Sequence, residues 1–175
     1  MAITTQQSSS NLTTSTTPAF LFTSAITRVN NVLPYAADTV YGGPLQLVSN
    51  VTPKANQWLL ITDVSIFYNF GVVPPGMTNF QLYVYKSLPP SAVGDTGAFS
   101  VPLIDEASIH YPEGLFLGSA KKAKGGGSVV LQMNNINVPI QLTGTSFFAY
   151  LVSIGAFTPA AALETAMLKV RTIAL

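Results

Sequence analysis

The sequence predicts an all-β fold, a single jelly-roll-like β-sandwich of about eight strands with an extended N-terminal arm. Short runs rich in Val, Ile, Phe, Tyr and Thr are separated by clusters of Pro, Gly and Asn. Several of these runs alternate apolar and polar residues with a period of two, as strands with one buried face do. Helix signals are weak, since only residues 159–166 are compatible with one or two helical turns.

The N-terminal segment differs in composition from the rest of the chain. Residues 4–17 are almost entirely Thr, Ser, Gln and Asn, which cannot bury enough apolar area to offset the entropy of ordering. We expect an arm that is flexible alone, or that docks on a neighbouring subunit. Phe20 and Phe22 are candidate anchors at its base. The expected organisation is an arm over residues 1–22 and a sandwich domain over residues 23–175.

Eight strands are expected after the arm. The clearest period-two pattern places Val64, Ile66 and Tyr68 on one face of a strand, and the C-terminal run shows the same alternation. Pro and Gly clusters mark the connections, and residues 87–112 form a long loop. The expected strands are Ala25–Val29, Leu45–Val48, Trp58–Phe70, Asn79–Tyr85, Leu115–Ser119, Ser128–Met133, Ser146–Ile154 and Met167–Ile173.

The composition points to burial against other protein subunits. Hydrophobic residues make up 48% of the chain and charged residues 9%, against roughly 25% charged in an ordinary domain. No apolar run approaches the roughly 20 residues of a membrane-spanning helix, so no membrane association is expected. A chain with so few charges has to cover much of its surface, and partner subunits are the simplest means.

The charge and the cysteine content argue against a nucleic-acid-binding protein and against a protein with disulfides or thiolate sites. The net charge is +1, without the basic stripe that a nucleic-acid partner requires. Because cysteine is absent, disulfides, thiolate metal sites and cysteine nucleophiles are excluded. The first residues lack the basic and apolar regions of a signal peptide, so we expect a protein made and used without secretion.

The polar residues around the single histidine are the candidates for catalysis. Asp105, Glu106 and Ser108 precede His110 closely, but closeness in sequence does not make a catalytic triad. Asp95 could join Asp105 and Glu106 at a metal site, although no calcium-loop motif is present. We expect no enzyme activity, cofactor, metal or small-molecule substrate. An enzyme would require these carboxylates to converge with His110 in a pocket.

Two further groups are candidates for an interface. Lys121, Lys122 and Lys124 form the densest positive charge in the chain, and residues 124–128, with three consecutive glycines, are predicted to form a mobile hairpin tip. Their order is the reverse of a phosphate-binding loop, so contact with an acidic partner surface is the functional alternative to a solvated turn. Tyr83 and Tyr85 share the strand face opposite Phe80, which suggests packing against a second sheet, a subunit interface or a ligand platform.

The order of motifs resembles a group of structural proteins of tailed bacteriophages. The motifs are Ile26-Thr-Arg-Val-Asn30, Tyr35-Ala-Ala-Asp-Thr-Val40, Phe80-Gln-Leu-Tyr-Val-Tyr85, Leu88-Pro-Pro-Ser-Ala-Val-Gly-Asp-Thr-Gly-Ala-Phe99 and Leu115-Phe-Leu-Gly118. The resemblance covers roughly residues 25–175. Val29 stands where the group has Pro, Asp38 lacks its preceding Gly, and Thr96-Gly97 replaces Asn-Ala.

The resemblance implies a jelly-roll capsid decoration, or cement, protein that forms homotrimers. Its partners would be the major capsid protein and further copies of itself, and it would lie on the capsid surface after assembly in the host cytoplasm. Two other binding functions remain open. A carbohydrate-binding jelly-roll module or head fibre domain would expose a strip of aromatic residues. The coat protein of a small virus commonly has a basic arm, whereas no Lys or Arg precedes Arg28 here.

Overall fold

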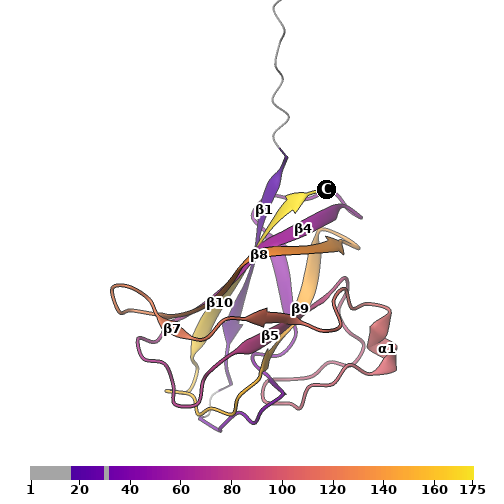
Figure 1. The fold of residues 1–175 in the computed structure, drawn as a ribbon. Helices are drawn as coiled ribbons and strands as arrows, with labels where there is room; N and C mark the ends of the chain where they lie inside the picture. Colours follow the sequence, from indigo (N-terminus) through magenta and orange to yellow (C-terminus); the bar gives the residue numbers. More distant parts are fainter. Residues whose placement is uncertain (1–16, 30–31) are drawn as a thin grey trace, which may run out of the picture.

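A computed structural model describes residues 17–29 and 32–175 and confirms the all-β fold. The strands form one antiparallel sheet that curls around a common core in a sandwich-like arrangement (Figure 1). The elements are β1 (Ala19–Thr27), β2 (Thr39–Val40), β3 (Leu45–Ser49), β4 (Trp58–Tyr68), β5 (Phe80–Tyr85), α1 (Leu103–Glu106), β6 (Leu115–Leu117), β7 (Lys121–Lys122), β8 (Val129–Gln141), β9 (Ser146–Ser153) and β10 (Thr165–Ala174).

The strand order is β6-β5-β9-β3-β1-β10-β4-β8-β7, and β2 adds to the end of β9. The sheet curls so far that its two ends approach each other. A Cβ on Gly118, just after β6, would lie 3.1 Å from the carbonyl oxygen of Gln132 in β8. The alternation predicted from the sequence is confirmed, because Val64, Ile66 and Tyr68 are all buried in the core.

The first strand begins earlier than predicted. β1 starts at Ala19 instead of Ala25 and pairs with β10 along its whole length, from Ala19 opposite Ile173 onward. Phe20 and Phe22 therefore point into the core and are 8% and 0% exposed. Residues 19–22 belong to the sheet, and the expected arm before Thr17 lies outside the described residues.

Two other segments differ from the prediction. β8 continues to Gln141 instead of ending near Met133, and it tolerates Pro139 because no described strand pairs with that stretch on its outer side. Residues 159–164 form bends and a turn and no helix. The left-handed φ of 54° at Leu163 reverses the chain, and β10 begins two residues later, after the buried Glu164.

The long loop over residues 87–112 covers a second, smaller core. That core contains Val40, Tyr85, Tyr150 and Val152. The loop carries the short helix α1, which lies to one side of the sheet in Figure 1. Within the described part of the chain, no helix has the length and apolar character needed to cross a membrane.

Candidate interaction surfaces

A buried ionic cluster lies at the end of the molecule where β1 ends and β10 begins. The Nε of Arg28 donates a hydrogen bond to the hydroxyl of Tyr35 at 2.6 Å, and that hydroxyl donates to Oδ1 of Asp95 at 2.5 Å. The backbone N–H of Gly42 donates to the same carboxylate oxygen at 2.8 Å. The Arg28 Nε also lies 3.9 Å from Oδ2 of Asp95. Burial and the bond to Asp95 raise the pKa of Tyr35, so its hydroxyl stays protonated as the donor.

The cluster ties two loops together. The Arg28 backbone N–H donates to the Glu164 carbonyl at 3.0 Å, and its guanidinium donates to the Ala161 carbonyl at 3.4 Å. The Glu164 carboxylate in turn accepts the Ala161 N–H at 2.9 Å. On the other side, Tyr35 and Phe157 exchange backbone hydrogen bonds and stack their rings at 4.8 Å. Residues 28–29, 32–35 and 157–164 therefore form one paired unit.

The exposed residues that the structure describes in this unit are mostly apolar. Among its described residues, the charged ones are Arg28 and Glu164, and both are buried, at 1% and 4% exposure. The exposed side chains include Val29, Val32, Leu33, Ala160, Ala161 and Leu163. We call these six residues the apolar tip. Because Arg28 and Glu164 are buried beneath these residues, the surface of the tip is aliphatic.

Leu163 is the most unusual residue of the apolar tip. It has a left-handed backbone conformation, which is rare for a branched apolar residue, and its side chain is 52% exposed. Such a conformation costs on the order of 1 kcal/mol and persists only where the surroundings impose it. Here the hydrogen bonds of Glu164 and Ala161 hold the turn. The fold thus maintains an exposed leucine at some energetic cost.

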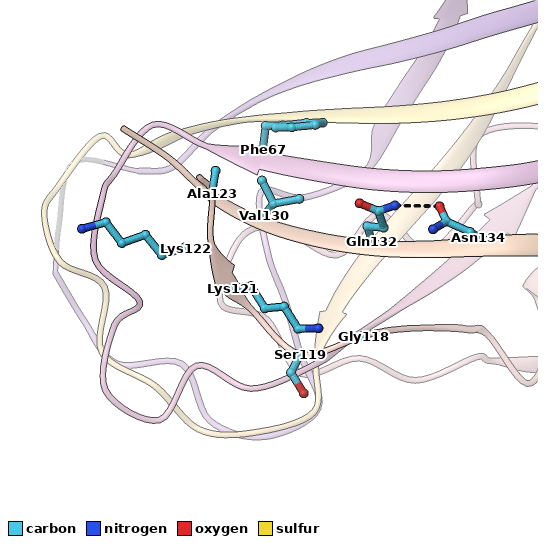
Figure 2. Close-up of a pocket in the computed structure, with 9 residues that line it drawn as sticks. All are labelled: Phe67, Gly118, Ser119, Lys121, Lys122, Ala123, Val130, Gln132 and Asn134. Carbon is cyan, nitrogen blue, oxygen red and sulfur yellow. Dashed lines mark hydrogen bonds between the residues drawn. The ribbon is translucent and has the colours of Figure 1, made fainter. Parts of the chain in front are cut away.

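A groove of about 560 Å³ lies on the opposite side of β4 and β8 from the core, beneath the β7–β8 hairpin (Figure 2). Phe67 and Val130 supply its apolar lining, and Lys121 and Lys122 stand on the hairpin. The hairpin tip predicted at residues 124–128 is confirmed: Gly125 and Gly126 have left-handed φ values of 100° and 86°, and Ala123 bonds to Ser128.

A second depression continues the groove across the sheet. It is lined by Lys169 and Arg171 of β10 and by Asp63 of β4, and it shares Phe67 with the groove. The Lys169 ammonium lies 4.8 Å from the centre of the Phe67 ring, a cation–π distance. We call the groove and this depression together the basic face. It joins four lysine and arginine side chains to exposed aromatic and amide groups.

The other candidate interface residues have different surroundings. Phe20, Phe22 and Tyr85 are buried within the subunit, and the Tyr85 ring packs edge-on against Tyr150. Tyr83 is partly exposed and packs against Phe99 at 4.3 Å. The loop that directly follows β5, residues 87–112, folds back over this tyrosine face and packs Phe99 against Tyr83. The sequence left the role of the face open because nothing in the loop's composition shows that it returns onto the preceding strand.

The residues considered for catalysis bond mainly to the backbone. His110 Nε2 lies 2.9 Å from the Gln141 carbonyl oxygen, and the Ser108 hydroxyl donates to the Asp105 carbonyl at 2.8 Å. The Asp105 carboxylate accepts the N–H and the hydroxyl of Ser91. Among the described residues, no three acidic or histidine side chains are placed to hold a metal ion.

Three large aromatic side chains are exposed in the part of the chain that the structure describes. They are Trp58 at the start of β4, Phe67 near its end, and Phe116 on β6.

Comparison with known proteins does not assign the chain to a family. No protein-family model, no curated protein and no solved structure matches the chain. The resemblance to tailed-phage cement proteins therefore rests on the sequence motifs. Several of those motifs meet in the buried ionic cluster, which takes Arg28, Tyr35 and Asp95 from three different motifs.

Proposed function

We propose that this protein is a capsid decoration protein, which self-associates into a trimer and binds between major capsid subunits of a tailed-phage head. The observation that carries the proposal is the apolar tip, where Arg28 and Glu164 are buried and aliphatic side chains are exposed. Exposed apolar patches on soluble proteins mark interaction sites. Contact between copies would remove this surface from water.

The low charge of the chain supports the same function. Only 9% of the residues are charged, and the buried ionic cluster removes three of those charges from the surface. A trimer on a closed shell has three attachments, so modest individual affinities combine into tight binding. A protein that binds the assembled shell and not its free subunits stabilises the shell by mass action.

The first test is the mass of the protein in solution, by light scattering or native mass spectrometry. We expect a trimer at micromolar concentration. A protein that stays monomeric at the highest soluble concentration would contradict the proposal. Co-sedimentation with shells of the major capsid protein encoded in the same genome then tests attachment, and we expect bound trimers and a higher shell melting temperature.

Point variants connect the trimer to the apolar tip. Leu163→Gly removes the exposed side chain and relieves the left-handed strain, so we expect a folded protein with weakened self-association. Leu33→Ser tests the neighbouring loop. The matched control is Leu88→Ser, because Leu88 is also 52% exposed but lies in the loop after β5. Equal self-association in all three variants would show that the tip is not the contact.

A further inference from the structure

We infer that the basic face is a docking surface for an acidic segment of a partner polypeptide. This inference goes beyond the proposed function and does not depend on trimer formation. It begins from the distribution of charge. The chain has eight basic residues, of which Lys121, Lys122, Lys124, Lys169 and Arg171 lie on or beside the basic face. Of the seven acidic residues, Asp63 is the one that lines it.

This separation of charge is large for a protein whose net charge is +1. Lys121 and Lys122 are exposed, and the ion pair found within the described residues is the one between Arg28 and Asp95, which does not involve the hairpin. The hairpin lysines thus have no carboxylate within 4.0 Å in the described part of the chain. Clustered like charges repel each other, and an anionic partner relieves that repulsion.

The hairpin that carries these lysines is held in place. A Cβ on Gly71 would lie 2.5 Å from the carbonyl oxygen of Gly126, so the hairpin tip packs directly on the loop after β4. The Lys122 side chain passes close to Gly126, and the Lys121 side chain extends toward Ser119 on the other side (Figure 2). A fixed hairpin loses little entropy when a ligand binds.

The lining of the groove favours a polypeptide. Phe67 is 38% exposed and Val130 lies beside it, so an apolar side chain of a partner has a place to pack. The amides of Gln132 and Asn134 bond to each other at 2.8 Å and retain further donors and acceptors for a peptide backbone. An acidic segment with an apolar residue would satisfy both the lysines and this lining.

Nucleic acid fits the basic face less well. Single strands bind by stacking bases on open aromatic faces, and here the Lys169 ammonium already lies over the Phe67 ring. Addition of a partner strand to the edge of β8 is unfavourable too, because Asn135 has a left-handed φ of 58° and Pro139 lacks an N–H.

The test is fluorescence anisotropy with the full-length protein and three labelled probes at low salt. The probes are a short peptide that alternates Glu with Leu and Gly, its counterpart with Gln in place of Glu, and oligothymidylate. We expect saturable binding of the acidic peptide, weakening with added salt, and weaker binding of the other two. Tighter binding of oligothymidylate, or no binding of the acidic peptide, would overturn the inference.

Matched variants locate the site. Lys121→Gln combined with Lys122→Gln should weaken binding of the acidic peptide roughly five- to tenfold. The control neutralises Lys54 and Lys86, two exposed lysines away from the groove, and should leave binding unchanged. Phe67→Ser tests the apolar contribution with the charges intact. If the Lys54 and Lys86 control loses as much affinity for the acidic peptide, the effect comes from net charge alone and the proposed site is wrong.

Discussion

The hydroxyl of Tyr35 donates a hydrogen bond of 2.5 Å to the carboxylate of Asp95, although sixty residues separate them in the chain. The contact joins the segment after β1 to the long loop after β5. Since Asp95 also accepts the Gly42 N–H and pairs with Arg28, one carboxylate holds three parts of the chain. The apolar tip lies over this arrangement, so the cluster is expected to contribute both to the stability of the fold and to the proposed self-association.

Removal of the Asp95 carboxylate should destabilise the fold strongly. Asp95→Ala removes the carboxylate that pairs with the buried Arg28 guanidinium, and breaking a buried pair typically costs about 3–5 kcal/mol. We expect a loss of about 3 kcal/mol in the free energy of unfolding, measured by urea denaturation. The control Glu106→Ala, at an exposed position, should change it by less than about 0.5 kcal/mol. Similar values for the two variants would show that the cluster contributes little.

The glycine behind this cluster should not accept a side chain. Gly42 has a φ of 81°, and a Cβ there would lie 2.3 Å from Cγ2 of Ile26. Overpacking and an unfavourable backbone conformation together predict a cost of about 2–4 kcal/mol for Gly42→Ala. Gly144→Ala is the control, since nothing lies within 4 Å of its added Cβ. Differential scanning calorimetry should show a lower melting temperature for Gly42→Ala only.

The strands of the core could be predicted because period-two alternation reports burial directly. Val64, Ile66 and Tyr68 were assigned to one face from the sequence and are buried there. The start of β1 was missed because the Thr/Ser-rich run before it hides the alternation of Phe20 and Phe22. The end of β8 was missed because Asn residues and Pro139 read as a loop, although an edge strand tolerates them.

The interaction surfaces were less predictable, because they depend on contacts between distant segments. The lysines of the hairpin were recognised from their sequence clustering, but Lys169 and Arg171 join them only through the pairing of β10 with β4. The sequence around Arg28, Asp95 and Glu164 does not indicate that these three side chains are buried. The apolar tip follows from that burial and could not be identified from the sequence.

His110 should make stability depend on pH near neutrality. Burial lowers its pKa below 6.5, the hydrogen bond to the Gln141 carbonyl opposes this shift, and the charge of Lys86 adds to it. The unfolded chain therefore takes up a proton at a higher pH than the folded protein does. The free energy of unfolding should be greatest above pH 6.5, fall as the pH drops through the interval between the two pKa values, and level off below it.

Urea denaturation between about pH 7.5 and about pH 5.5 measures this dependence. His110 is the single histidine of the chain, so His110→Gln should flatten the profile while an amide N–H can still reach the Gln141 carbonyl. A profile that keeps the same slope in the variant would assign the dependence to the carboxyl groups instead.

Two truncations should separate the N-terminal arm from the first strand. Deletion of residues 2–16 removes only residues that precede the sheet, and the Pro18 carbonyl can still accept the Ala174 N–H at 2.8 Å. We expect an unchanged unfolding midpoint and weaker attachment to the partner shell. Deletion through residue 22 also removes Phe22, which is fully buried and packs on Phe147 at 4.8 Å.

The longer deletion should cost at least the roughly 3–5 kcal/mol of a lost core phenylalanine and expose the edge of β10. Circular dichroism against urea, with light scattering for aggregation, distinguishes the two truncated proteins. If the shorter deletion also unfolds the protein, residues 2–16 take part in the fold of the subunit. If the longer deletion keeps the wild-type midpoint, pairing of Phe22 with Val170 does not hold the sheet together.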